Sequence, residues 1–259
     1  MSKYFLFFKY SELLINLSIK EIKVRYKSAI LGFLWAVIVP MAMMAVFYFI
    51  FYKLFNYREL TPVYLLSALF PWMFVNQTLS QSVTAYIDNA NIIKKVYFPR
   101  EIIPLSIMLA NLFNFILSVI LLLIIAFLSG YPISINLLLL PLPILSVILL
   151  ASGVALLSSA VHVLFRDIKY FVEIFLIVWF YFTPIFYDQK LIRQFSEYAF
   201  KIFLLNPMTG IIVMLRDIIL YGSFSSIKMT IFTIFLCVLI YFIGLTVNLK
   251  LNKNFADYV

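Results

Sequence analysis

The sequence predicts an all-α integral membrane protein with six transmembrane helices per subunit, and three observations predict this class. Of the 259 residues, 65% are hydrophobic and 12% are charged, with a mean hydropathy of +1.07, whereas soluble domains carry about 25% charged residues. The charged residues lie in short clusters between long charge-free runs. These runs approach or exceed about 20 residues, the length of helix that crosses about 30 Å of hydrocarbon.

The predicted spans follow from these runs in chain order. The run 102–165 contains no Asp, Glu, Lys or Arg and is too long for one crossing. Gly, Pro, Ser and Asn in the segment 129–136 predict a turn that divides it. The six predicted spans are residues 28–52, 61–87, 102–128, 137–165, 170–187 and 229–249.

The basic residues predict the orientation. With both termini in the cytoplasm, 13 of the 20 Lys and Arg residues lie inside, as expected for cytoplasmic loops. The net charge of +9 does not indicate nucleic-acid binding, because the basic residues are scattered between apolar runs. We therefore expect a multi-pass membrane protein with an N-terminal region at 1–27 and a single transmembrane domain at 28–259.

The N-terminal region is predicted to form an amphipathic interface helix. Ile15, Ile19, Ile22 and Tyr26 recur at helical spacing, and a second narrow apolar stripe lies opposite (Leu13, Leu17 and Val24). A helix that only floats on lipid needs one apolar face. Two faces indicate a helix held between the bilayer and either a partner protein or its own bundle; a simple basic anchor is the other interpretation.

The segment 188–228, on the outer side, is unusually apolar for a loop. Asn206, Pro207 and Gly210 divide it into two pieces, each too short to span. We expect two re-entrant helices before the last span, because irregular backbone at membrane depth must be buried in protein or line a cavity. An interfacial helix pair without a role in transport is the alternative.

The sequence contains no motif that is typical of a catalytic centre. There is no GxxxxGK[ST] phosphate loop and no HExxH or CxxC motif, and there is one histidine and one cysteine. We predict no catalytic residue, no metal site and no cofactor in this chain. If the protein is a pump, a separate subunit must supply the energy.

Uncharged polar and aromatic residues inside the spans are candidates for a translocation path. Asn76, Ser80 and Thr84 share one face of the second span, Asn111 and Asn114 lie in the third, and Phe47 and Phe51 lie in the first. Such residues suit a hydroxyl-rich solute. Two other interpretations stay open: hydrogen bonds between helices for the polar residues and an interfacial aromatic belt for the rings.

The loop between the second and third spans is a candidate docking surface. The stretch NIIKKVYF is compatible with a short helix, and Pro99 disfavours helix at the preceding residue. We expect apolar and aromatic side chains, including Tyr97 and Phe98, to be exposed below the membrane, which indicates a partner protein. A loop that only fixes topology through its charges is the alternative.

The order of several motifs resembles the permease subunits of ABC-2-type exporters of lipid-linked polysaccharides, the O-antigen, capsule and teichoic acid export family. The matching stretches cover nearly the whole chain: KEIKVRYKSAILGFLWAVIVP (20–40), NIIKKVYFPREIIP (91–104), FRDIKYFVEIFLIVWFYFTPIFY (165–187), NPMTGIIVMLRD (206–217) and the terminal FADYV.

The resemblance implies partners and site residues. It implies a homodimer in the prokaryotic plasma (inner) membrane and two copies of a separate ABC ATPase subunit, which bind the ATP and Mg. The loop 88–101 becomes the coupling helix, with the predicted ATPase-coupling residues Lys94, Lys95, Tyr97, Phe98, Pro99 and Arg100. An anionic, diphosphate-linked lipid carrying a glycan is the implied cargo. Basic clusters bind anionic head groups, so the predicted head-group residues are Lys20, Lys23, Arg25 and Lys27.

Two other functions fit parts of the sequence. An ABC-2-type permease for drugs or small lipids would share the fold. A membrane-embedded transferase acting on a lipid carrier would need clustered aspartates or a metal site, and the acidic residues are few and dispersed.

Overall fold

The computed structural model describes residues 10–27, 31–56, 60–188, 192, 194, 196–224 and 226–252. Within them the chain forms helices joined by turns, with no β-strand. The predicted all-α class is confirmed. The elements are α2 (Ser11–Tyr26), η1 (Gly32–Leu34), α3 (Trp35–Phe47), η2 (Tyr48–Leu54), α4 (Pro62–Ser82), α5 (Ala85–Asp88), α6 (Ala90–Lys95), α7 (Ile102–Leu128), η3 (Ile135–Leu139), α8 (Pro141–Leu164), α9 (Ile168–Tyr181), α11 (Glu197–Leu204), α12 (Pro207–Ile219) and α13 (Ile227–Leu251).

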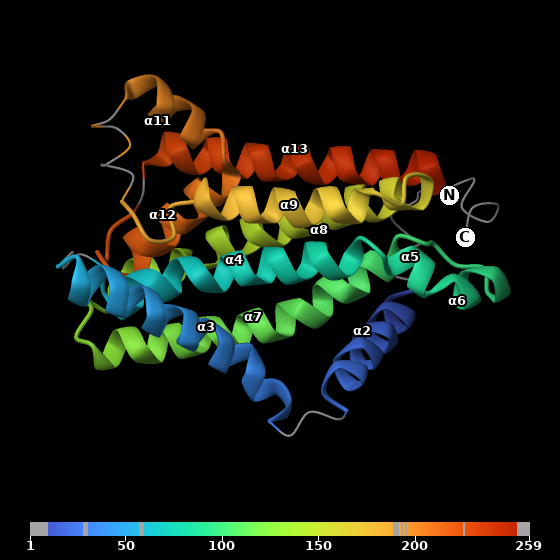
Figure 1. Ribbon diagram of the computed structural model, residues 1–259, viewed down its shortest axis with the longest axis horizontal. Helices are drawn as coiled ribbons and strands as arrows, with labels where there is room; N and C mark the ends of the chain where they lie inside the picture. Colours follow the sequence, from blue (N-terminus) through green and yellow to red (C-terminus); the bar gives the residue numbers. More distant parts are fainter. Residues whose placement is uncertain are drawn as a thin grey trace.

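The long helices run roughly along one axis of an elongated bundle (Figure 1). α2, α5, α6 and the end of α13 lie at one end of this bundle, and α11 and α12 lie at the other. We call these the α2 end and the α12 end. The arrangement separates the two features that the sequence indicated as sites, the basic helix and loop at one end and the broken apolar segment at the other.

Four helical stretches within the described residues are long and apolar enough to cross a membrane: Val37–Leu54, Ile102–Leu128, Ile135–Leu164 and Ile227–Leu251. They coincide with the first, third, fourth and sixth predicted spans. The second and fifth predicted spans correspond to α4 and α9, which lie alongside the others in the bundle (Figure 1). α4 carries several polar side chains, and α9 has only 14 helical residues, so neither stands out by length and composition.

Local signals in the sequence set the helix ends. The Thr61 hydroxyl caps α4 by accepting a hydrogen bond from the Tyr64 amide at 3.3 Å, and Pro62 occupies the first turn. α7 ends at Leu128, and two residues further on Gly130 has a φ of 80°, which favours glycine. The Tyr131 amide donates a hydrogen bond to the Ala126 carbonyl, and the Gly130 amide donates one to the Phe127 carbonyl. These two bonds form a Schellman motif, which satisfies the last carbonyls of the helix.

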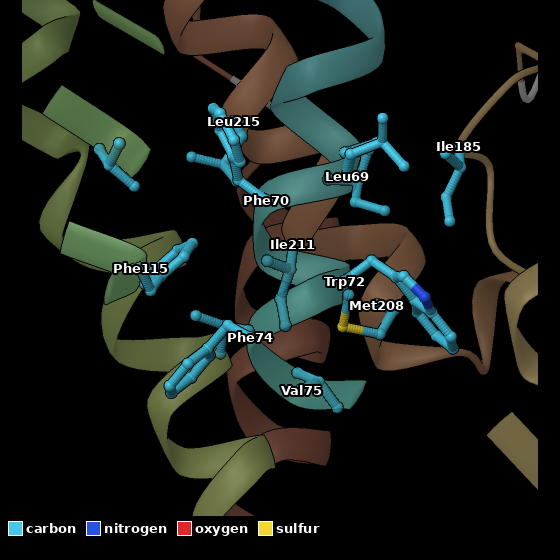
Figure 2. Packing of buried hydrophobic residues seen from close by; sticks show 14 of the residues in the cluster. Leu69, Phe70, Trp72, Phe74, Val75, Phe115, Ile185, Met208, Ile211 and Leu215 are labelled. Carbon is cyan, nitrogen blue, oxygen red and sulfur yellow. The ribbon is translucent and has the colours of Figure 1, made fainter. Parts of the chain in front are cut away.

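α4 forms the centre of the bundle. Phe74 stacks on Phe115 of α7, Trp72 meets Trp179 of α9 edge-on, and Leu69 lies on the side of Ile185 (Figure 2). A helix surrounded by protein does not need a lipid-facing surface. The polar residues of α4 can therefore find partners inside the molecule.

α8 and α13 cross at backbone contact. Gly153 of α8 lies against α13, and a Cβ atom added there would be 2.7 Å from the Tyr241 Cα. Gly244 of α13 lies against the Gly153 carbonyl. Small residues allow this close approach, which is how helices gain van der Waals contact when lipid supplies no hydrophobic driving force.

Candidate functional site: a polar pocket and an exposed loop

α2 lies against the bundle through side chains from both of its predicted apolar stripes. Leu13, Leu14 and Leu17 pack against a buried cluster formed by the ends of α5, α7 and α8, while Ile15 and Ile19 on the other side are exposed. The predicted stripes do not match this face, because Val24 of one stripe is 64% exposed whereas Tyr26 of the other reaches Asn114.

The last turn of α2 inserts two side chains between α4 and α7. Arg25 donates from Nη1 to the Asn111 Oδ1 at 2.7 Å and from Nη2 to the Gln81 Oε1 at 2.5 Å. Asn111 in turn donates to the same Gln81 oxygen at 3.1 Å and to the Thr78 hydroxyl at 3.3 Å. The result is a hydrogen-bonded network across three helices.

Tyr26 makes the second attachment. Its hydroxyl accepts a hydrogen bond from the Asn114 Nδ2 at 2.9 Å. Asn111 and Asn114, both predicted path residues, are buried and join α2 to the bundle.

A pocket of about 480 Å³ lies beside this network. Its basic residues are Lys20 and Arg25 of α2 and Lys169 of α9, and α4 contributes Ser80 and Gln81. The remaining lining residues are Glu21, Val24, Thr84, Ala85, Asp88, Asn89 and Ile107. Lys23 and Lys27 are exposed and do not line it.

Sequence reasoning missed Lys169. The sequence showed a basic residue in the short FRDIK loop, but nothing in its spacing indicated that this residue and α2 line the same pocket. Of the predicted path residues, Ser80 and Thr84 line the pocket, and Asn76 is half-buried further along α4.

The end of α3 and η2, which carry Phe47 and Phe51, lie toward the α12 end, away from α2 (Figure 1). Both rings contact Phe186, with centroid distances of 5.7 and 5.5 Å. Phe47 also stacks on Phe180 of α9 at 6.2 Å. The structure therefore divides the predicted path residues between the two ends of the bundle.

The loop after α6 exposes one aromatic ring and buries the next. The Tyr97 side chain is 97% exposed, whereas Phe98 is 6% exposed and packs with Ile93, Ile103 and neighbouring apolar residues. The expectation that both rings are exposed is thus correct for Tyr97 and wrong for Phe98. Lys94 and Lys95 are exposed, and Pro99 is partly buried.

Hydrogen bonds tie this loop to two other elements. Lys20 of α2 donates to the Asn89 Oδ1 at 3.3 Å. Arg100 donates to the Asn252 carbonyl at 2.6 Å, and the Asn252 side chain donates to Glu101 at 3.3 Å. The loop is therefore anchored to both α2 and the end of α13.

A buried arginine at the α12 end was also missed. Arg216 donates to the carbonyls of Ile185 at 2.9 Å and Tyr64 at 3.3 Å, and its guanidinium lies 3.5 Å from the centre of the Tyr64 ring. These contacts join α12 to the start of α4 and to the chain after α9. The signal that could have identified this site is an ionisable residue within an apolar segment.

Asn206 makes a similar junction. Its Oδ1 accepts from the Trp179 indole at 2.9 Å and from the Met208 amide at 3.0 Å, and its Nδ2 donates to the Phe182 carbonyl at 3.0 Å. Beside it lies an apolar cavity of about 830 Å³ bounded by α8, α9, α11, α12 and α13.

The helical bundle, with apolar helices long enough to span a membrane and a polar pocket at one end, defines a multi-pass membrane protein. The chain belongs to the ABC-2 type transporter family, whose model matches residues 12–220.

It is similar to two proteins of Klebsiella pneumoniae described as "O-antigen export system permease protein RfbA". One is 31% identical over 252 residues, covering 95% of this chain and 94% of the relative. The other is 29% identical over 254 residues, with the same coverage. A protein of that description from Myxococcus xanthus is 29% identical over 205 residues, 79% of this chain and 78% of the relative.

Proposed function

We propose that the protein is the transmembrane permease subunit of an ATP-driven ABC exporter that moves an O-antigen-type, lipid-linked polysaccharide out of the cytoplasm. The observation that carries this proposal is the similarity, along 95% of the chain, to permeases named for O-antigen export. The predicted lack of a catalytic centre agrees with a transport subunit.

The protein then lies in the prokaryotic plasma (inner) membrane with six spans and both termini in the cytoplasm. α4 and α9 complete the six, supported by their position alongside the four apolar helices (Figure 1). α11 and α12 form the re-entrant pair on the outer side. Arg216 supports this role, because its hydrogen bonds satisfy the buried carbonyls of Ile185 and Tyr64 where irregular backbone meets the bundle.

The partners are two copies of an ABC ATPase subunit, which bind ATP and Mg, and a second copy of this chain. The exposed Tyr97 with Lys94 and Lys95 beside it forms the ATPase-docking surface, and Phe98, Pro99 and Arg100 hold that surface in place. The exposed apolar faces of α3 and α9, which include Val46, Phe171 and Ile174, are available to the second copy and to lipid.

The cargo is a glycan on a lipid diphosphate. Lys20, Lys23, Arg25 and Lys27 attract its phosphates at the cytoplasmic leaflet. The glycan then follows Asn76, Ser80, Thr84, Asn111 and Asn114 toward the rings of Phe47 and Phe51. Asn111 and Asn114 contribute when α2 moves away, since α2 occupies their amide groups in this conformation.

The test uses the permease purified with its ATPase and reconstituted in lipid. We expect glycans on a lipid diphosphate to stimulate ATP hydrolysis and to be transported, and hydrophobic drugs to have no effect. Stimulation by drugs and not by the glycolipids would favour a drug or small-lipid permease. Isolation of an active chain without any ATPase would favour a lipid-carrier transferase.

A further inference from the structure

The pocket at the α2 end has basic residues on two walls that belong to different parts of the fold. Lys20 and Arg25 come from α2, and Lys169 comes from the first turn of α9. Polar side chains of α4, Ser80 and Gln81, line the space beside them. At about 480 Å³ the pocket is within the range of about 300–1,000 Å³ that small-molecule sites occupy.

Arg25 is held by neutral groups. It donates hydrogen bonds to the amide oxygens of Asn111 and Gln81, and within the described part of the chain it forms no ion pair. Amide oxygens fix the guanidinium plane without cancelling its charge. A guanidinium has five N–H donors, so further donors remain for a phosphate, which arginine binds well in a bidentate manner.

Two carboxylates also line the pocket, and both have partners within the protein. Glu21 lies 3.8 Å from Lys20. Asp88 accepts a hydrogen bond from the Thr84 hydroxyl at 2.6 Å. Three cations against two carboxylates leave an excess of positive charge, which favours an anionic ligand.

We infer that this pocket binds the diphosphate of the lipid-linked glycan, with Lys169 of α9 and Arg25 and Lys20 of α2 as its contacts. The inference rests on the proposed function and sharpens it. Lys23 and Lys27 lie outside the pocket and act only through long-range attraction, which salt screens over about 8–10 Å at physiological ionic strength. Lys169 thus joins Lys20 and Arg25 as a residue that binds the substrate.

The experiment measures the glycolipid concentration that half-stimulates ATP hydrolysis by the reconstituted permease–ATPase complex. Lys169→Gln should raise this concentration about tenfold or more, because it removes a hydrogen bond to a charged group, and tenfold corresponds to about 1.4 kcal/mol. Lys169→Arg should stay near wild type, which separates a charge contact from misfolding. Lys250→Gln, which removes a lysine at the same end of the bundle but outside the pocket, is the matched control.

The dependence on salt distinguishes binding in the pocket from long-range attraction to the exposed basic residues. Raising the ionic strength should abolish the effect of Lys23→Gln and leave most of the effect of Lys169→Gln. A Lys169→Gln variant that matches Lys250→Gln, in a complex that glycolipid still stimulates, would overturn the pocket assignment alone. A wild-type complex that glycolipid does not stimulate would overturn the proposed function.

Competitors identify the source of the phosphate. Inorganic diphosphate should compete with the glycolipid in the wild type, and Lys169→Gln should weaken that competition. Vesicles rich in phosphatidylglycerol should compete poorly. Equally strong competition by phosphatidylglycerol would overturn the assignment to substrate, because bulk lipid would then fill the pocket.

Discussion

Exchanging Tyr97 for alanine should weaken association with the ATPase without changing the stability of the permease. Exchanging the adjacent Phe98 for alanine should instead lower the stability of the permease. Tyr97 is 97% exposed, so Tyr97→Ala should change the stability of the isolated permease by no more than about 0.5 kcal/mol. Phe98 is buried among Ile93, Ile103 and other apolar side chains. Phe98→Ala should therefore cost about 3–5 kcal/mol, the usual cost of removing a buried ring.

The assay compares two quantities for each variant. The first is the melting temperature of the purified permease in detergent, and the second is the amount of ATPase retained by the tagged permease. If Tyr97 is an energetic centre of the docking surface, its loss costs about 2 kcal/mol or more. That corresponds to roughly 30-fold weaker association, at 1.4 kcal/mol per tenfold.

A matched control is Tyr198→Ala, which removes another exposed tyrosine, 81% exposed, at the opposite end of the bundle. It should leave both quantities unchanged. Full ATPase retention by Tyr97→Ala would refute the docking surface. A melting temperature of Phe98→Ala equal to that of wild type would refute the anchoring role of Phe98.

The other predictions concern contacts that hold the bundle. Gly153→Ala should lower the melting temperature through about 1–3 kcal/mol of overpacking, because its Cβ would lie 2.7 Å from the Tyr241 Cα; an unchanged melting temperature contradicts the close crossing. Arg216→Met should destabilise the α12 end by roughly 1.5–3 kcal/mol per lost charged hydrogen bond, seen as faster proteolysis of the segment after α9, and equal proteolysis of wild type and variant would argue against this clamp. Asn248→Leu should cost about 1–3 kcal/mol by removing its hydrogen bonds to Tyr86 and to the Leu156 carbonyl, and a wild-type melting temperature would show that these bonds contribute little.

The sequence was sufficient to locate the long apolar helices and the turns between them. Charge-free runs located α7, α8 and α13 because each has an apolar surface toward lipid. Gly130 marked the end of α7 because only glycine readily takes the left-handed conformation there. Hydropathy describes α4 less well, because this helix lies inside the bundle and satisfies Thr78 and Gln81 with protein partners.

The candidate site was predicted only in part. Helical spacing placed Arg25 on one flank of α2, but only the tertiary structure shows that this residue reaches Gln81 and Asn111. Tyr97 and Phe98 differ because the chain leaves α6 in extended conformation, with Val96 at φ −130° and ψ 134°. Successive side chains of an extended segment point to opposite sides, so one ring faces out and the next faces in.

The loop 88–101 and the polar pocket share Asp88 and Asn89, so we expect a movement of one to act on the other. Asn89, where α6 begins, receives the Lys20 hydrogen bond, and it lines the pocket together with Ala85 and Asp88. Arg100 fixes the far side of the loop to the end of α13. We expect a force applied at Tyr97 to reach α5 and α6, because the buried Phe98 packs against the same cluster as Ala85, Tyr86 and Ile93. A displacement of α5 would then change the pocket wall, since Ala85 and Asp88 line it.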